Sequence, residues 1–134
     1  MWQWIRNRRG NPPKDRRELG REGEELTLRY LRRLGYEILD RNYRCPYGEI
    51  DIVARDGTEI VFVEVRRRSG TGYGIPQESL TSRKVDHLLK SALFYLKHKN
   101  LTSFPFRFDL AAVDKRGKVE LEKNFIFVSG GRRY

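Results

Sequence analysis

The sequence predicts an α/β fold in which a mixed β-sheet is flanked by helices. Two segments place apolar residues at helical spacing, and short runs of β-branched and aromatic residues lie between and after them. An Asp-Gly pair at residues 56–57 indicates a tight hairpin at the centre of the sheet, so the strand direction is expected to be mixed. The expected order along the chain is helix, three strands, helix and two strands.

The 134 residues suit one folded domain that is long enough to bury a core. We expect this domain at residues 18–128. Residues 1–17 are basic and interrupted by Pro12 and Pro13, which is typical of a flexible arm. Residues 129–134 are expected to form a disordered tail.

The first helix is expected over Leu19–Leu34, where Leu26, Tyr30 and Leu31 form one apolar side. Gly35 follows directly. Glycine is typical of the residue that ends a helix, so we expect the helix to stop here.

Three strands follow this helix. We expect them over Tyr36–Tyr43, Tyr47–Arg55 and Glu59–Arg66. The third run is rich in valine, isoleucine and phenylalanine, which suits a strand buried on both faces.

The rest of the chain supplies a helix and two strands. Glycines within residues 67–80 predict a mobile loop. Thr81 or Ser82 can cap the second helix. The last two strands are expected over Phe106–Val113 and Val119–Val128.

Lysine and arginine outnumber aspartate and glutamate by 28 to 18, which gives a formal net charge of +10. This surplus favours nucleic acid as a partner, with an anionic membrane surface that Trp2 and Trp4 would enter as the alternative. No run approaches the ~20 apolar residues that span a bilayer. The one cysteine, Cys45, excludes a disulfide framework, so we expect a cytoplasmic protein that binds nucleic acid, in particular DNA, and no membrane.

Three carboxylates are predicted to share one face of the central hairpin. With a two-residue loop at residues 56–57, Asp51 lies opposite Phe62 and Glu49 lies opposite Glu64. Because side chains alternate along a strand, four charged residues then point the same way: Glu49, Asp51, Glu64 and Arg66.

Clustered carboxylates repel one another and lose solvation, so at least one of them is expected to have a raised pKa in the absence of metal. Mg²⁺ or Mn²⁺ would relieve the repulsion, because these ions prefer a few carboxylate oxygens with water completing the shell. The alternative is a solvated face on which Arg66 neutralises Glu64. The apolar neighbours Ile50, Ile52 and Phe62 favour the metal, since charges beside them are costly unless they are used.

Glu24 is expected to add a carboxylate from the first helix. Helical spacing puts it on the same side as Gly20, Thr27 and Leu31. The alternative is an ordinary acidic first turn, because other glutamates stand beside it.

Several short motifs occur in one order: G-x-x-G-E at Gly20–Glu24, G-Y at Gly35–Tyr36, G-E-I-D-I at Gly48–Ile52, F-V-E-V at Phe62–Val65, Y-G-x-P at Tyr73–Pro76 and R-F-D at Arg107–Asp109. Their combination resembles the YraN family of small bacterial proteins over roughly residues 19–127. That family is similar to the restriction-endonuclease-like PD-(D/E)xK superfamily, in particular to Holliday-junction resolvases. The resemblance implies an αβββαβ core and makes residues 18–128 an endonuclease-like domain.

The resemblance also implies roles for single residues. Asp51 and Glu64 would be metal ligands, and Glu24 would be a catalytic acid on the helix. From its predicted place on the same face, we add Glu49 as a third metal ligand. The superfamily signature ends in lysine where this chain has Arg66; arginine cannot act as a base, but as a catalytic residue it could stabilise charge on a transferring phosphate.

Four basic residues bracket the glycine-rich loop beside this face: Arg67, Arg68, Arg83 and Lys84. Together they are expected to hold the phosphates of a nucleic acid, with recognition of backbone or shape rather than of bases. Lys84 could also point into the site.

Three hypotheses of function follow. The first is a Mg²⁺- or Mn²⁺-dependent endonuclease that hydrolyses DNA, with selectivity for branched structures. The second is a non-catalytic protein that keeps the nuclease fold and binds nucleic acid or acts as a scaffold, because Arg66 could take the metal's place beside Glu64. The third is a basic peripheral membrane protein. A homodimer would suit the cutting of two strands.

Overall fold

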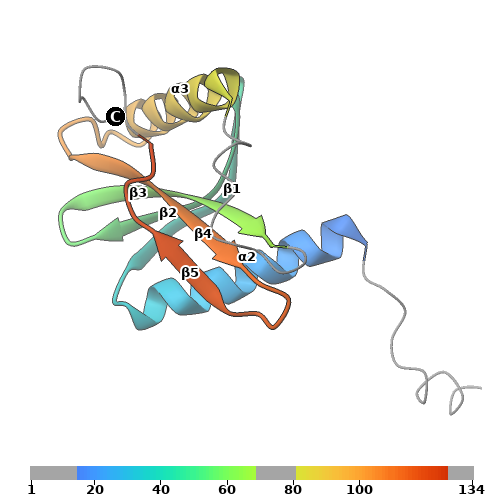
Figure 1. The fold of residues 1–134 in the computed structure, drawn as a ribbon. Coiled ribbons are helices and arrows are strands. Elements are labelled where there is room, and N and C mark those ends of the chain that lie inside the picture. The colour runs from blue at the N-terminus through green and yellow to red at the C-terminus, as the bar shows by residue number, and fades with distance from the viewer. Residues whose placement is uncertain (1–14, 69–80, 127–134) are drawn as a thin grey trace, which may run out of the picture.

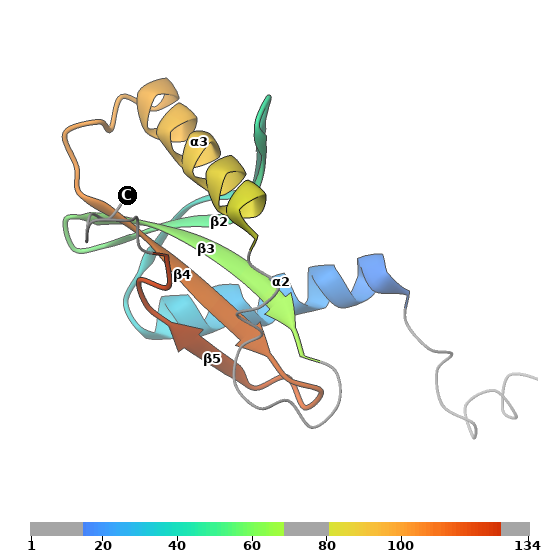
Figure 2. The same cartoon turned by 45° about the horizontal axis from the view of Figure 1, so that its top comes forward.

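Two helices cover the two faces of a five-stranded sheet in a computed structural model, which describes residues 15–68 and 81–126 (Figures 1 and 2). In chain order the elements are α2 (Arg16–Arg33), β1 (Glu37–Cys45), β2 (Gly48–Asp56), β3 (Glu59–Arg67), α3 (Ser82–His98), β4 (Phe106–Val113) and β5 (Val119–Glu122). The predicted α/β class and element order are confirmed. Of the loop predicted at residues 67–80, Arg67 belongs to β3 and residues 69–80 lie outside the described residues, as does the tail at 129–134.

The sheet has the strand order β1-β2-β3-β4-β5. Three neighbouring pairs are antiparallel, whereas β3 and β4 run parallel and are joined across α3. The strand direction is therefore mixed, as the hairpin predicted. Because β2, β3 and β4 are inner strands, polar residues on them are held in the most buried part of the sheet.

Helix α2 begins and ends at recognisable signals. The Asp15 carboxylate accepts a hydrogen bond from the Glu18 amide at 2.8 Å, which caps the first turn. At the other end Gly35 has a φ of +91°, and its amide bonds to the carbonyl of Arg32. The predicted boundary of the arm at residue 17 thus falls inside the first turn, and residues 1–14 lie outside the described part of the chain.

The core has two halves, one on each face of the sheet. On the α2 side, Leu28 and Leu31 pack on Ile52, Val61 and their neighbours. On the α3 side, a second set packs around aromatic rings: Ile50, Val53, Ile60, Phe62, Leu88, Ala92, Tyr95, Leu96, Phe108 and Ile126. No helix of the described residues is long and apolar enough to cross a membrane.

The predicted turn of the central hairpin was wrong by one position. The two turn residues are Gly57 and Thr58, and Asp56 pairs with Glu59. Gly57 has a φ of +63°, which glycine adopts without the steric cost that aspartate would meet. The register is therefore displaced by two residues from the prediction, so that Phe62 lies opposite Val53.

Local hydrogen bonds and backbone turns determine where α3 begins and where β5 ends. The Thr81 hydroxyl accepts the Lys84 amide at 3.1 Å and caps α3. Strand β5 stops at Glu122, earlier than predicted, because Asn124 turns the backbone with a φ of +56°. The amide of Phe125 then bonds to the carbonyl of Phe108.

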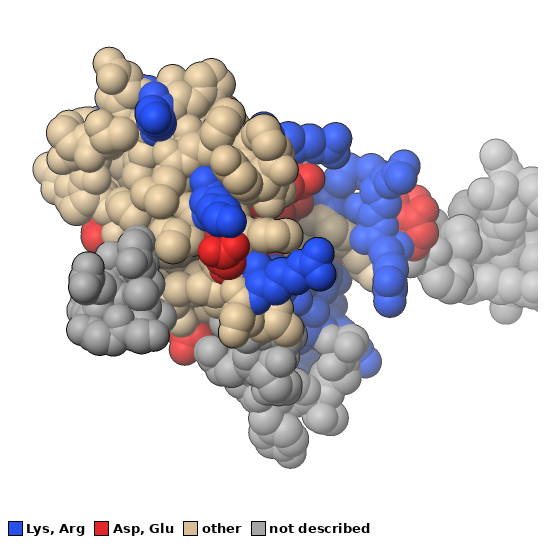
Figure 3. All heavy atoms as spheres, turned by 90° about the horizontal axis from the view of Figure 1, so that it is seen from above, with Lys and Arg blue, Asp and Glu red and all other residues tan. Residues whose placement is uncertain are grey.

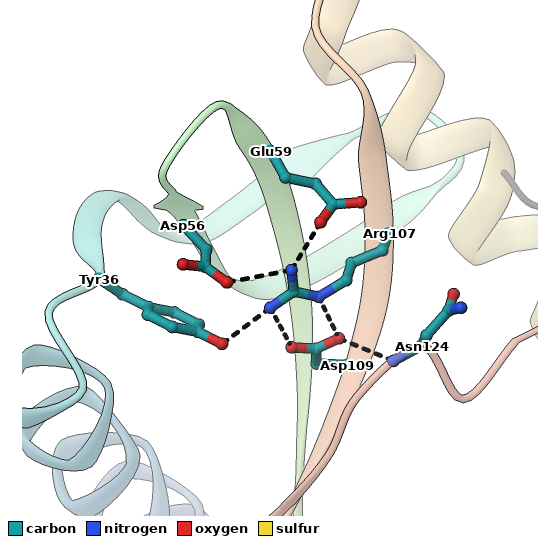
Figure 4. A network of polar contacts seen from close by, with 6 residues as sticks. All are labelled: Tyr36, Asp56, Glu59, Arg107, Asp109 and Asn124. Carbon is teal, nitrogen blue, oxygen red and sulfur yellow. Dashed lines mark hydrogen bonds and ion pairs between the residues drawn. The ribbon is translucent and has the colours of Figure 1, made fainter.

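A buried ion network closes the end of the sheet that contains the β2–β3 turn (Figure 4). The Arg107 guanidinium contacts both oxygens of Asp109, at 3.0 and 3.1 Å, and Asp109 is fully buried. The same guanidinium also lies 2.7 Å from Glu59, 3.2 Å from Asp56 and 2.8 Å from the hydroxyl of Tyr36. One side chain of β4 thereby joins the start of β1, the end of β2 and the start of β3.

Replacing this guanidinium should destabilise the protein strongly. Arg107→Met leaves the Asp109 carboxylate buried without its cation, so we expect the free energy of unfolding to fall by roughly 3–5 kcal/mol. Urea denaturation measures this. Arg55→Met is the matched control, because that arginine is 47% exposed in its ion pair with Glu37 and should cost no more than about 1 kcal/mol. Equal losses in the two variants would contradict a structural role for the network.

Candidate functional site

The candidate site lies where β2 and β3 stop pairing. The last paired residues toward this end are Ile52 and Val63. Beyond them the Val65 amide donates a hydrogen bond to the Asp51 carboxylate, at 2.8 Å, rather than to the backbone of β2. The carboxylate thus replaces a ladder partner and is held at the opening between the two strands.

Strand β2 does not alternate strictly at this point. Ile50 packs in the α3-side core, whereas Ile52 packs in the α2-side core, although two residues two apart in a regular strand share a face. In β1, Asn42 has a φ of +49° and lies between the pairs that flank Asp51. The backbone of β2 therefore changes face around Asp51, which borders cavities on both sides of the sheet.

The α3-side cleft has a volume of about 560 Å³. Its lining comes from the β1–β2 turn, the ends of β2 and β3 and the first half of α3: Tyr47, Gly48, Glu49, Asp51, Glu64, Val65, Thr81, Arg83, Lys84, His87, Leu88 and Ser91. Gly48 is favoured at this turn because its φ is +144°, a backbone conformation that other residues rarely adopt.

The α2-side hollow is smaller, with a volume of about 250 Å³. Glu24 of α2 lines it together with Asp51, Arg66 and Arg67. Asp51 is common to both cavities, so it is the residue through which the two sides of the site meet.

Burial raises the pKa of Asp51 from an ordinary value of 3.8 to about 7, and the negative charge of Glu64 adds to the rise. The hydrogen bond from Val65 acts in the opposite direction, and the charges of Glu24 and Glu49 contribute further increases. This is the raised carboxylate pKa that the sequence led us to expect.

Two cations contact the other central carboxylate, Glu64. Its side chain is 11% exposed, and the same oxygen lies 3.2 Å from Arg66 Nε and 2.9 Å from Lys84 Nζ. The predicted neighbourhood of Glu64 and Arg66 is confirmed. The contact with Lys84 depends on how α3 packs on the sheet, which spacing along the chain does not specify.

Glu24 approaches the site from the α2 side. Burial raises the pKa of Glu24, and a hydrogen bond with Asn42 partly offsets the rise. The structure thus brings this carboxylate to the hollow shared with Asp51, as predicted, with Asn42 as a neighbour that sequence reasoning missed. The positive φ of Asn42 is a local feature that only the folded backbone reveals.

Glu49 lines the α3-side cleft together with Asp51 and Glu64. It is ion-paired with Arg44 at 3.4 Å and is 40% exposed. The described residues contain no group of three or more His, Cys, Asp and Glu side chains arranged to hold a metal ion. The three carboxylates thus share one cleft, as expected, and the role of Glu49 as a third metal ligand stays a prediction.

The four basic residues expected to bind phosphate separate into three places. Arg83 and Lys84 line the α3-side cleft, and Arg67 packs over Gly23 on the α2 side. Arg68 is 11% exposed and ion-paired with Glu120 of β5 at 2.9 Å, so the structure does not bring it to the cleft. Lys and Arg side chains crowd the molecule where α2 begins, whereas the face over α3 consists mainly of other residues (Figure 3).

Comparison with known proteins gives one consistent result. Residues 23–113 match the uncharacterised protein family UPF0102. A UPF0102 protein of Dehalococcoides mccartyi is 46% identical over 113 residues, which cover 82% of this chain and 93% of the relative. One from Desulfitobacterium hafniense is 44% identical over 119 residues, covering 86% and 96%, and one from Geobacter sulfurreducens is 50% identical over 95 residues, covering 71% and 74%.

Neutralising Asp51 should stabilise the protein at high pH. Below about pH 4 the carboxyl is protonated in both folded and unfolded chains; between about pH 4 and pH 7 only the unfolded chain ionises, so wild-type stability falls as the pH rises. At pH 8 and without divalent metal, Asp51→Asn should therefore be more stable by roughly 2–4 kcal/mol, and near pH 4 the difference should vanish.

Urea denaturation in EDTA at the two pH values measures this difference. Asp86→Asn is the matched control, because Asp86 is 54% exposed on α3 and should show no comparable gain at pH 8. A wild-type protein that is as stable as Asp51→Asn at pH 8 would contradict the raised pKa.

Proposed function

The chain belongs to the uncharacterised protein family UPF0102, which is the YraN family that its motifs resemble, and we propose that it is a Mg²⁺- or Mn²⁺-dependent endonuclease that hydrolyses DNA phosphodiesters. The observation on which this depends is the convergence of Asp51 and Glu64 at the opening between β2 and β3, beside Lys84 and Arg66. A cleft that combines buried acids and cations suits phosphoryl chemistry, because both a metal and a negatively charged phosphate find partners there.

The donor set fits a hard divalent cation. Asp51 and Glu64 would hold it, since Mg²⁺ is commonly bound by one or two carboxylates with waters and substrate phosphates in the remaining positions. Burial and then the negative charge of Glu64 raise the pKa of Asp51, and a bound cation would offset both effects. When bound, the ion lowers the pKa of a water ligand and so makes it a nucleophile at neutral pH.

Lys84 would supply the ammonium that the superfamily signature places two residues after the glutamate. Arg66 occupies that position in the sequence, but Lys84 reaches the same Glu64 oxygen from α3 and lies closer to it. Both cations would offset charge on the transferring phosphate. Arginine cannot act as a base, so of the two side chains only Lys84 has the type that the superfamily signature requires.

The positive charges nearest the cleft would position DNA. Arg83 stands on the rim of the α3-side cleft, and Arg67 lines the hollow on the other side of the sheet. Phosphate contacts of this kind fix the orientation of a duplex or branch without reading bases. Glu24, beside Asp51, would serve as the further catalytic acid on α2.

A second candidate is a non-catalytic protein that binds nucleic acid or acts as a scaffold. One observation favours it: Arg66 and Lys84 both contact the same Glu64 oxygen, at a place that a metal would otherwise occupy. In this case the two cations neutralise Glu64 permanently, and binding to DNA would depend on salt but not on metal.

Cleavage of junction, flap and single-stranded DNA with Mn²⁺ tests the first candidate. We expect Asp51→Ala and Glu64→Ala each to lower the rate by about 10²-fold or more, because residues behind metal ligands already cost about 10- to 100-fold. Lys84→Met should lower it by about 10²–10³-fold through lost charge stabilisation. Residual activity equal to wild type in Asp51→Ala and Glu64→Ala would refute the proposal.

Two controls accompany this assay. Glu37→Gln removes an exposed carboxylate paired with Arg55, and Lys115→Met removes an exposed ammonium on the β4–β5 turn; neither lies near the cleft, so both should retain the wild-type rate. Loss of activity in either control would trace the effect of the site variants to net charge rather than to the site.

Calorimetry with Mn²⁺ separates the two candidates independently of turnover. A metal enzyme should show one site that disappears in Asp51→Asn and strengthens in Lys84→Met, because the ammonium competes with the ion for Glu64. A protein of the second kind should show no such site, while its affinity for DNA in EDTA still falls with rising salt.

A further inference from the structure

Exposed large apolar side chains gather beside the α3-side cleft. The described residues contain four of them: Leu34, Tyr47, Leu93 and Phe94. Leu34 ends α2, whereas the other three lie on the β1–β2 turn and on α3. Tyr47 lines the polar cleft and contacts Phe94, and exposed apolar residues at such a place indicate a surface that another molecule covers.

Tyr47 and Phe94 form an open aromatic pair at this place. Their ring centroids are 6.1 Å apart with an interplanar angle of 69°, and the residues are 45% and 38% exposed. Lys90 Nζ lies 5.9 Å from the centroid of the Tyr47 ring. The pair thus presents aromatic surface to solvent with a cation beside it.

This aromatic pair continues the cleft of the candidate site. Tyr47 itself lines that cleft. On α3, Lys84, His87, Ser91 and Phe94 follow one another at intervals of three or four residues, so they share one side of the helix. From Lys84 to Phe94 this side extends about 15 Å along the helix axis, a distance that a few nucleotides bridge.

Ser91 adds a polar partner between the two ends. Its side chain is fully buried, lines the cleft, and its Oγ makes no hydrogen bond within the described residues. A buried hydroxyl without a partner is unusual and costly, so a ligand oxygen in the cleft would satisfy it. Along the cleft a ligand would therefore meet first the acids and a lysine, then a hydroxyl, and finally two aromatic rings.

We propose that Tyr47 and Phe94 are a stacking platform for unpaired bases of single-stranded DNA. This inference deepens the proposed function and rests on it, because it assigns the DNA a single-stranded segment next to the carboxylates. Aromatic rings stack on any base, and basic side chains beside them hold the backbone. A partner protein would bury the two rings equally well, but Arg83 on the cleft, together with Lys84 and Lys90 in their pairs with Glu64 and Asp86, favours a polyanion.

Fluorescence anisotropy with labelled oligonucleotides tests the platform. The full chain is titrated in EDTA against a single-stranded oligothymidine and a blunt duplex of equal length, at a salt concentration that weakens phosphate contacts. We expect Tyr47→Ala/Phe94→Ala to lose roughly 5- to 100-fold in affinity for the single strand and less than about twofold for the duplex. Tyr47→Phe/Phe94→Tyr keeps both rings and should retain the wild-type affinity.

Leu34→Ala is the matched control, because it removes an apolar side chain of similar exposure away from the cleft. Equal losses on single strand and duplex, a similar loss in Leu34→Ala, or an altered oligomeric state on gel filtration without a change in affinity would overturn the platform.

Parallel cleavage assays with Mn²⁺ keep the two proposals distinguishable. Loss of single-strand preference without loss of cleavage in the alanine variant would support the platform alone, since binding is measured without metal. A wild-type protein that cleaves DNA but prefers the duplex would refute the platform and leave the nuclease standing. A preference for the single strand without any cleavage would refute the nuclease and support the platform.

Discussion

The hydrogen bond from the Val65 amide to the Asp51 carboxylate is the interaction on which the site depends. It stands where the β2–β3 ladder ends, and it lets the two strands separate without leaving an amide of the inner sheet unpaired. Because β2 changes face at the same point, one carboxylate borders cavities on both sides. In a regular hairpin this carboxylate would border only one face of the sheet.

The electrostatics of the two central acids are opposed. Burial raises the pKa of Asp51, whereas Glu64 is ion-paired with both Arg66 and Lys84. A buried carboxyl with a raised pKa suits a centre that a bound cation would stabilise. Burying the Asp51 carboxylate lowers the stability of the fold. Carboxylates with strongly perturbed pKa values are found mostly at functional sites, so this cost points to a function.

Local chemistry made much of the fold predictable, and packing explains the rest. Gly35 ended the first helix, and alternation in β3 put Glu64 beside Arg66 correctly. The predicted hairpin register was wrong because Asp56 still pairs with Glu59, which leaves Gly57 and Thr58 as the two turn residues. The Lys84 contact depends on the docking of α3, a distant packing event that spacing along the chain does not encode.

The Arg107 network has a consequence for how the chain finds its pairing. Sliding β4 along β3 by two residues would keep every apolar side chain on its own face, so hydrophobicity alone tolerates the error. The same slide would part Arg107 from Glu59, Asp56 and Tyr36, which belong to other segments. The buried ion cluster thus fixes the register of β4 on β3 at one end of the sheet. The positions of the carboxylates at the other end depend on the same register.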